Sequence, residues 1–412
     1  MRPGKEVQLA DLDWPSLISE GRQVVWSQGT AEPVTLTQNL MAARERIGSF
    51  SAFVGFSFGN SVSPDHTDRV SFQSYCGTAN NSKLREQLDI LPIHYSELSS
   101  ELGQRKPVLL LSLAEGQDEN SFSFGPAADF TADLINSAHL VIAEVSSKAP
   151  RTSGGNDVRR DQIDFIVRTD TPLLAPRAVS PTDDEAKIAS LIASMIEDGS
   201  TLQIGLGSLP IAIMHALRSH KDLGFHSGVF VQEVADLMDS GIINNARKRL
   251  DTGISTAGIL SGDQSLLDWC HDRKDLQLRP VSYTHDVGVL SQIDRFVALN
   301  SAIEVDLTGQ VNAELAAGRY LGAVGGAPAF MRGAAQSKGG LGIIALPSTA
   351  KTRSRIVNKL SGPVSTARSD VGFVVTENGI ADLRGASLSE RRDRLMAIAH
   401  PDFQSDLDAG LL

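Results

Sequence analysis

The chain has 412 residues, of which 41% are hydrophobic and 21% are charged, a composition typical of a soluble globular protein with two or three domains. Its formal net charge of −11 argues against nucleic acid as the main partner. Apolar runs such as Pro107–Ala114 are far shorter than the roughly 20 residues that span a bilayer, so we expect no membrane association.

The N-terminus and the cysteines indicate a cytoplasmic protein. Residues Met1–Glu6 lead into acidic positions without an apolar stretch, so we expect no signal peptide. Only two cysteines occur, Cys76 and Cys270, and neither has a cysteine at metal-binding spacing. We therefore expect two packed free thiols in a reducing compartment, and no metal site.

Two stretches of the chain repeat the same order of elements. In the first, a helical segment ends at Gly21, a short apolar strand follows, and a turn contains Gly29. In the second, Gly199 matches Gly21 and Gly207 matches Gly29 without a gap. The match favours two related halves. The other predicted strands alternate with helices, which is typical of mostly parallel sheets covered by helices: Leu140–Val145, Val229–Val231, Phe296–Leu299, Gly342–Leu346 and Val371–Val375.

The boundary between the halves is predicted at 170–183. Residues Thr171–Pro181 contain three prolines and have no helical period. Thr182 is a predicted N-cap for a helix that starts with acidic residues at Asp183. We therefore divide the chain into two α/β domains, 1–178 and 179–412.

A glycine turn after the second strand is a candidate anion site. It comprises Gly205, Leu206, Gly207 and Ser208 and leads into a helix predicted at Ile211–Arg218. Exposed amides at such a turn can hold an anion or an oxyanion, although two close glycines are a weak signal alone. Pro210 stands where a dinucleotide-binding motif has its third glycine, so we rank that kind of site low.

Two further candidates are polar residues next to apolar strands. Glu304 and Asp306 share one face of a predicted strand, as catalytic acids could, but solvated carboxylates at a strand end are more common. His226 precedes the apolar run at Val229. Without other information, a hydrogen-bonded structural histidine is the simpler interpretation of His226.

The segment Leu315–Ser369 contains no Asp or Glu. On charge alone, a site for a phosphate-bearing small ligand and a solvated basic face are equally plausible. Two glycine-rich loops inside the segment, Gly322–Gly326 and Lys338–Gly342, favour the ligand. The segment holds eight basic residues: Arg319, Arg332, Lys338, Lys351, Arg353, Arg355, Lys359 and Arg368.

Nearly the whole chain resembles the acetyl-CoA hydrolase / 4-hydroxybutyrate CoA-transferase family. The resemblance implies two similar open-sheet domains of the CoA-transferase (NagB/RpiA-like) type with the active site in the cleft between them. It also implies acyl-CoA and a small acceptor as partners, no cofactor beyond CoA as substrate or product, and a homodimer or higher homo-oligomer. Besides Gly205–Pro210 and His226, the matching stretches are Ile142–Val145, Pro150–Gly154, Asp236–Gly241, Asn300–Asn312, Ser337–Gly340, Leu346–Lys351, Thr376–Gly385 and Ile398–Phe403.

The resemblance also implies which residues meet the CoA ester. The turn Gly205–Ser208 matches the oxyanion and CoA-binding loop. The other positions assigned to CoA binding are Gly325, Gly326, Lys338, Lys351 and Asn378.

Members of this family use a glutamate that attacks the acyl-CoA thioester and then carries CoA as a glutamyl thioester. In the ungapped match over Gly224–Gly241, Gly228 stands at that glutamate's position. Ala327 and Ala329 replace polar family residues, and Asn378 replaces a tyrosine. The fold and ligand signatures persist, and the polar residues at the centre of the site differ.

Three hypotheses follow from these departures. The first is an acyl-CoA enzyme that avoids the glutamyl intermediate and uses water, an intramolecular nucleophile or another acceptor, with His226, Glu233 or Glu304 as general base. The second is an ordinary CoA-transferase that uses Glu233 or Glu304 as its nucleophile, which is less favoured because the new carboxylate must reach the same carbonyl. The third is a non-catalytic acyl-CoA-binding protein.

Overall fold

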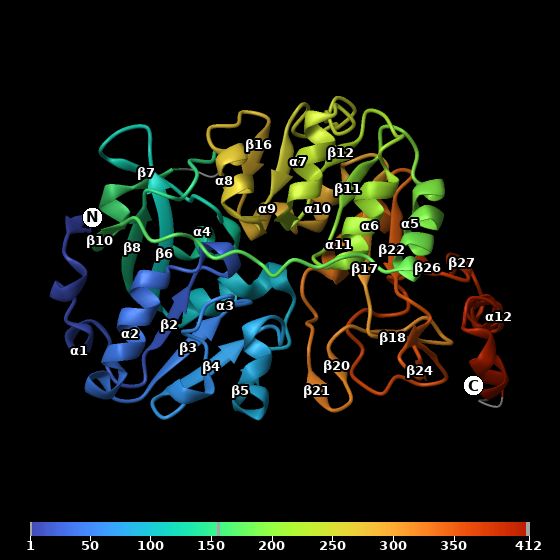
Figure 1. Ribbon diagram of the computed structural model, residues 1–412, viewed down its shortest axis with the longest axis horizontal. Helices are drawn as coiled ribbons and strands as arrows, with labels where there is room; N and C mark the ends of the chain where they lie inside the picture. Colours follow the sequence, from blue (N-terminus) through green and yellow to red (C-terminus); the bar gives the residue numbers. More distant parts are fainter. Residues whose placement is uncertain (1, 155–156, 409–412) are drawn as a thin grey trace. The chain divides into compact units, whose positions relative to one another are not determined.

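The computed structural model describes residues 2–154 and 157–408, which form two compact units (Figure 1). Unit 1 runs to Arg177 and also contains Val229–Gln232 and Thr256–Thr284. Unit 2 contains Ala178–Gly228, Glu233–Ser255 and the chain from His285. Each unit has its own apolar core.

Unit 1 is built on a parallel sheet whose strands lie in the order β1-β10-β8-β6-β2-β3-β4-β5. Residues along β2, β6 and β8 are almost all buried, because helices cover both faces of the sheet. The strands are β1 (Lys5–Glu6), β2 (Gln23–Trp26), β3 (Phe50–Val54), β4 (Val70–Ser74), β5 (Leu88–Ile90), β6 (Val108–Glu115), β8 (Leu140–Ser146) and β10 (Phe165–Thr169), and β7 (Ser121–Ser123) and β9 (Val158–Arg159) extend β6 in antiparallel fashion.

The helices of unit 1 form two layers. On one face, Leu36 and Leu40 of α2 pack with Trp26 in one apolar cluster. On the other face, the Phe130 ring of α4 meets Phe53 edge to face, with 6.1 Å between centroids. The helices are α1 (Trp14–Leu17), α2 (Val34–Ile47), α3 (Leu98–Gln104), α4 (Asp129–Leu134), α8 (Gln264–Cys270) and α9 (Val281–Thr284).

Two late segments of the chain belong to unit 1, although the sequence assigned them to the second half. β13 (Val229–Phe230) pairs in parallel with β15 (Ile259–Leu260). The amide of Ala128 donates to the Gly258 carbonyl at 3.1 Å, and the amide of Leu278 donates to the Ser153 carbonyl at 2.7 Å. Backbone pairing between segments so far apart leaves no local pattern in the sequence.

Unit 2 is built on a second sheet in the order β12-β11-β17-β22-β26-β27. The first five strands are parallel and β27 is antiparallel to β26. The strands are β11 (Thr201–Gln203), β12 (Gly224–Phe225), β17 (Phe296–Ser301), β22 (Leu341–Ala345), β26 (Phe373–Thr376) and β27 (Gly379–Asp382).

Helices of unit 2 cover its sheet, and short strands lie beside it. Phe330 and Met331 of α11 share a buried cluster with Phe296 and Ile344 of the sheet. The helices are α5 (Asp183–Met195), α6 (Ser208–Ala216), α7 (Gln232–Asp239), α10 (Val287–Ser291), α11 (Ala327–Gln336), α12 (Leu388–Ala397) and α13 (Gln404–Asp408). The short strands are β18 (Glu304–Asp306), β19 (Val311–Asn312), β25 (Ile356–Val357) and two hairpins, β20 (Leu315–Ala316) with β21 (Arg319–Tyr320), and β23 (Thr349–Ala350) with β24 (Arg353–Ser354).

The predicted fold class of two similar open-sheet α/β domains is confirmed. Gly21 and Gly199 both adopt left-handed backbone, with φ of +79° and +80°, and a single residue separates each from the start of β2 or β11. Gly29 and Gly207 follow those strands, again with positive φ, and a helix comes next. The two units therefore repeat one helix–glycine–strand–glycine–helix unit.

Smaller expectations are also settled. The Thr182 hydroxyl accepts from the amide of Glu185 at the start of α5, as predicted for an N-cap. α6 begins at Ser208 instead of Ile211, because Pro210 is tolerated in a first helical turn. Cys76 and Cys270 are both buried free thiols. Within residues 2–154 and 157–408, no helix is long and apolar enough to cross a membrane.

Candidate active site

The carboxyl edge of the unit 2 sheet gathers most of the candidate residues. Parallel strands end at the same edge, so the segments after β11, β12, β22 and β26 lie together there. They carry, in order, the Gly205–Ser208 turn, His226–Gly228, Leu346–Lys351 and Asn378. The N-terminus of α11 is at this edge too, because α11 leads into the amino end of β22.

The turn after β11 keeps its backbone open. No heavy atom of the described chain lies within 4 Å of a Cβ built on Gly205 or Gly207, and Leu206 between them is 47% exposed. Gly207 has φ +119° and directly precedes α6. The Ser208 hydroxyl donates to Glu185 Oε1 at 2.6 Å. The amides of this turn, at the N-terminus of a nine-residue helix, can therefore face an anion or an oxyanion.

The segment after β12 is fixed against the end of β11. The Ser227 hydroxyl donates to the Ile204 carbonyl at 2.9 Å, and the amide of Ile204 donates to Ser227 Oγ at 3.3 Å. His226 is fully buried, and its ring meets Phe296 edge to face with 6.4 Å between centroids. Gly228, at the end of this rigid segment, is thereby held beside the Gly205–Ser208 turn.

The space beside Gly228 is occupied by His285. A Cβ built on Gly228 would lie 2.9 Å from Cε1 and 3.1 Å from Nε2 of that imidazole. A Cβ built on Gly326 would lie 2.5 Å from the same Nε2. The ring of His285 is also 4.4 Å from that of Phe330, centroid to centroid. The imidazole is therefore packed between the Cα atoms of two glycines, one after β12 and one before α11.

His285 is held in its neutral form. Its side chain is buried, and burial lowers its pKa to about 3. The N-terminus of α11, at Gly326, adds a partial positive charge that disfavours an imidazolium in the same direction. Sequence reasoning did not select His285, since nothing in its local sequence marks its contact with Gly228 or Gly326.

The loops after β22 and β26 are joined by a carboxylate. The amide of Ser348 donates to Glu377 Oε2 at 2.8 Å, and the Ser348 hydroxyl donates to the other oxygen. The backbone N–H of Asn378 donates to Thr376 Oγ1 at 3.2 Å, and its side-chain Nδ2 donates to the Ile398 carbonyl at 3.4 Å. Lys351 is exposed at the turn between β23 and β24 and adopts φ +58°. Lys351 and Asn378 thus lie at the same edge as the glycine turn.

Lys338 lies at the other end of the sheet. It precedes β22, and its carbonyl accepts from the amide of Arg295, which precedes β17, at 2.8 Å. Both residues are therefore at the amino edge, separated from Gly205–Ser208 by the length of the parallel strands, at about 3.3 Å per residue. The structure separates Lys338 from the other predicted CoA-binding positions.

The basic segment does not form one face. Arg332 pairs with Asp370 at 2.8 Å, and Arg355 donates to the carbonyl of Ile303 at 2.8 Å. Burial lowers the pKa of Arg355. Of these positions, Lys351 and Arg353 are exposed on the β23–β24 hairpin at the carboxyl edge.

The Glu304 carboxylate is held by hydrogen bonds from neighbouring loops. Its Oε1 accepts from Asn312 Nδ2 at 2.9 Å, from the amide of Ser361 at 2.5 Å and from the amide of Gly362 at 3.2 Å. The Ser361 hydroxyl also donates to both carboxylate oxygens. The carboxylate therefore fixes the loop at Ser361 to β18.

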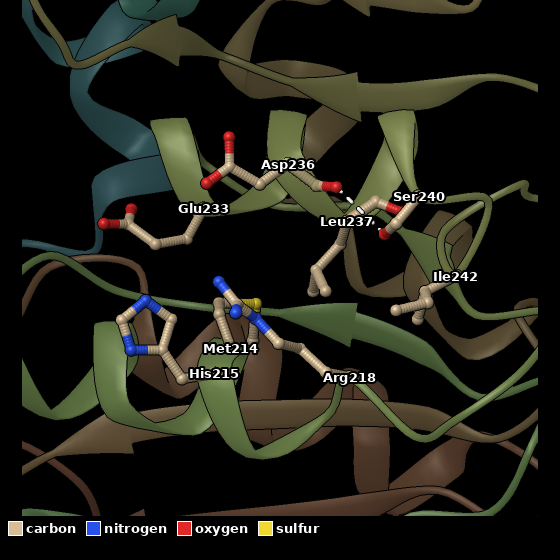
Figure 2. A pocket seen from close by; sticks show the side chains of 8 residues that line it. All are labelled: Met214, His215, Arg218, Glu233, Asp236, Leu237, Ser240 and Ile242. Atoms are coloured by element: carbon tan, nitrogen blue, oxygen red, sulfur yellow. Dashed lines mark hydrogen bonds between the residues drawn. The ribbon is translucent and has the colours of Figure 1, made fainter.

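Glu233 lines a hollow at the far end of α6 (Figure 2). The hollow has a volume of about 310 Å³. Figure 2 shows Glu233 on α7 above His215, which belongs to the last turn of α6, and Arg218 beyond it. The glycine turn is at the opposite end of α6, so the structure does not bring Glu233 to the turn. The hollow is lined by Met214, His215, Arg218, Glu233, Asp236, Leu237, Ser240 and Ile242.

Known proteins resemble this chain over nearly its full length. Residues 262–411 match the family model described as acetyl-CoA hydrolase/transferase C-terminal domain. A 4-hydroxybutyrate coenzyme A transferase from Clostridium kluyveri is 34% identical over 403 residues, covering 95% of this chain and 94% of the relative.

Solved structures give the same picture. RipA from Yersinia pestis is 29% identical, with a TM-score of 0.92, and the match covers 98% of this chain and 96% of RipA. A 4-hydroxybutyrate CoA-transferase from Porphyromonas gingivalis is 31% identical, with a TM-score of 0.83 and the same coverage. The chain therefore belongs to the acetyl-CoA hydrolase/transferase family of enzymes.

Proposed function

We propose that this protein cleaves an acyl-CoA thioester, or transfers its acyl group, without forming a glutamyl-CoA intermediate. The observation that carries the proposal is the environment of Gly228. The His285 imidazole leaves no room for a side chain at this position, where the family resemblance implies a nucleophilic glutamate. The acyl group then passes to water, to a nucleophile within the substrate or to another small acceptor.

The open turn at Gly205–Ser208 supports binding of the ester. When a nucleophile adds to a thioester carbon, the carbonyl oxygen becomes an oxyanion, and preorganised amides stabilise that charge. Lys351 and Asn378 at the same edge supply polar groups for CoA. CoA enters as a substrate or leaves as a product, and the reaction needs no metal or redox cofactor. We also expect a homo-oligomer in the cytoplasm.

Hydrolysis is the simplest form of the proposed reaction. Water adds to the thioester carbon and loses a proton to a general base. The predicted base His226 is fully buried and packs against Phe296, so it can serve only if its ring is exposed to the bound water. The tetrahedral intermediate then expels CoA as a thiolate, and the proton returns to it. One thioester and one water give one carboxylic acid and one free thiol.

The second candidate function is carboxylate-dependent CoA transfer through Glu233 or Glu304. The Glu304 carboxylate already accepts hydrogen bonds from Asn312, Ser361 and Gly362. Glu233 faces the hollow beside the last turn of α6. Neither position favours attack on an ester bound at Gly205–Ser208. The third candidate, a non-catalytic acyl-CoA-binding protein, retains the open turn without turnover.

Thiol release distinguishes the three functions. The purified protein is incubated with acetyl-CoA, butyryl-CoA or 4-hydroxybutyryl-CoA, with and without added acetate, and both free CoA and the individual acyl-CoA thioesters are measured by chromatography. Free CoA formed without acetate supports the proposal. Conversion of butyryl-CoA or 4-hydroxybutyryl-CoA to acetyl-CoA that strictly requires acetate supports the CoA-transferase. Tight binding of CoA without any turnover supports the non-catalytic protein.

A further inference from the structure

The relationship between Gly228 and His285 determines more than the absence of a nucleophile. Gly228 is not among the glycines with positive φ, so its backbone suits any residue and only the available space opposes a side chain. The nearest atoms to a built Cβ are Cε1 and Nε2 of His285, at 2.9 and 3.1 Å, followed by Phe330 Cζ at an ordinary 3.9 Å. The side chain of His285 therefore occupies the space that a side chain on residue 228 would need.

Apart from His285, the surroundings of Gly228 are held in place by the backbone of neighbouring elements. Ser227 is hydrogen-bonded in both directions to Ile204 at the end of β11. Gly326 opens α11 on the other side of the imidazole. Removing the imidazole therefore leaves a cavity whose walls are secondary-structure elements, next to the open turn at Gly205–Ser208. A side chain on residue 228 would enter that cavity.

We propose that His285 sets the reaction type of this site. Its imidazole occupies the space that a side chain on residue 228 would need. A glutamate at position 228 therefore becomes a working nucleophile only when the side chain of His285 is shortened. The inference rests on the proposed function. It adds that the absence of a carboxylate at residue 228 and the presence of an imidazole at residue 285 depend on each other. His285 acts here by occupying space.

In the double variant we expect covalent catalysis through the side chain of residue 228. In the G228E/H285A variant, the introduced carboxylate attacks the thioester carbon, CoA leaves as a thiolate, and an acyl–glutamyl anhydride forms. The thiolate then attacks the glutamyl carbonyl, the acyl group leaves as a carboxylate, and an enzyme-bound CoA thioester remains. A second carboxylate such as acetate reverses these steps and leaves as a new acyl-CoA.

The first test is a stability cycle, which does not depend on activity. The melting temperature is measured for the wild type, G228E, H285A and G228E/H285A. Overpacking against the imidazole lowers the melting temperature of G228E by roughly 2–10 °C relative to the wild type. The double variant is expected to melt above G228E. Equal melting temperatures for G228E and the wild type would overturn the inference.

A matched control uses another crowded glycine of unit 2. A Cβ on Gly333 of α11 would lie 2.5 Å from the Leu290 Cβ, and His285 is not among its nearest atoms. G333A should lose stability by the same kind of overpacking, and the loss should persist in G333A/H285A. Recovery by H285A in both backgrounds would mean that the alanine stabilises the protein in general, and the inference would be overturned.

The second test detects the covalent intermediate. Each variant is incubated with butyryl-CoA, treated with borohydride, digested and analysed by mass spectrometry. A reduced residue 228 is expected in G228E/H285A and in neither single variant. A double variant that regains stability and binds CoA but forms no adduct overturns the inference. An adduct in the wild type would contradict the proposed function instead, so the two failures are distinguishable.

Discussion

The Nε2 atom of His285 lies 3.1 Å from the point where a side chain on Gly228 would begin. The same atom lies 2.5 Å from the corresponding point on Gly326. One neutral imidazole thus fills the space between the end of β12 and the start of α11. The site retains an open glycine turn for the ester but has no carboxylate at residue 228.

Gly326→Ala should destabilise the protein. The new methyl group would meet His285 at a distance that real contacts do not reach, and overpacking of this kind costs about 1–3 kcal/mol of the free energy of unfolding. Urea denaturation measures the loss. Gly205→Ala is the control, because its Cβ meets no atom of the described chain within 4 Å, and its effect should stay within about 0.5 kcal/mol.

Glu304→Gln should reduce stability more than catalysis. The substitution replaces a carboxylate that accepts from Ser361 and Gly362 with an amide, and hydrogen bonds to a charged group contribute about 1.5–3 kcal/mol each. Thermal unfolding and the turnover of butyryl-CoA are measured on the same samples. Glu233→Gln should leave both nearly unchanged. A loss of turnover of 100-fold or more in folded Glu304→Gln would make Glu304 a catalytic base after all.

Asp129 should give the free energy of unfolding an unusual pH dependence. The carboxylate is buried, accepts from Gln28 and Tyr95, and burial raises its pKa from 3.8 to about 6. Between these two values the folded protein binds a proton that the unfolded chain has released, so the Asp129 contribution falls as pH rises from about 4 to about 6.

The comparison of Asp129→Asn with the wild type isolates this contribution. The difference in unfolding free energy between the two proteins should change across pH 4–6 and become constant above it. Asp11→Asn, an exposed position in the same unit, should show no such trend. A difference for Asp129→Asn that is the same at pH 4 and pH 7 would rule out the raised pKa.

The two cysteines should be unreactive in the native protein. Both thiols are buried, and burial raises the pKa of Cys270 to about 12 and the pKa of Cys76 above its usual value. The thiolate is the reactive form, so both should react slowly. A disulfide reagent should modify less than one thiol per native chain within minutes and both thiols in guanidinium chloride. Rapid native modification of Cys270 would contradict its burial.

Local sequence patterns predicted the architecture well. Gly21 and Gly199 marked equivalent turns before β2 and β11, and their nearly identical φ values show why glycine was needed at both. The cap at Thr182 was also evident, because the threonine directly precedes an acidic first turn. Such features depend on short-range geometry, which a single sequence carries.

The centre of the site depends on long-range geometry. His285 is far from Gly228 in the sequence, and only the folded sheet brings the imidazole to that glycine. The sequence left two interpretations of Glu304, a catalytic acid or the more common solvated carboxylate, because its partners Ser361 and Gly362 lie far along the chain. The position of Lys338 follows from the strand order alone, since a residue that precedes a parallel strand belongs to the amino edge of the sheet.

The central claim is that thioester cleavage proceeds without a glutamyl-CoA intermediate. The most direct measurement is to incubate the wild-type protein with butyryl-CoA while free CoA is being released, quench with borohydride, and search every glutamate-containing peptide by mass spectrometry. We predict CoA release with no reduced glutamate. A reduced glutamate at any position, formed in proportion to turnover, would contradict the account.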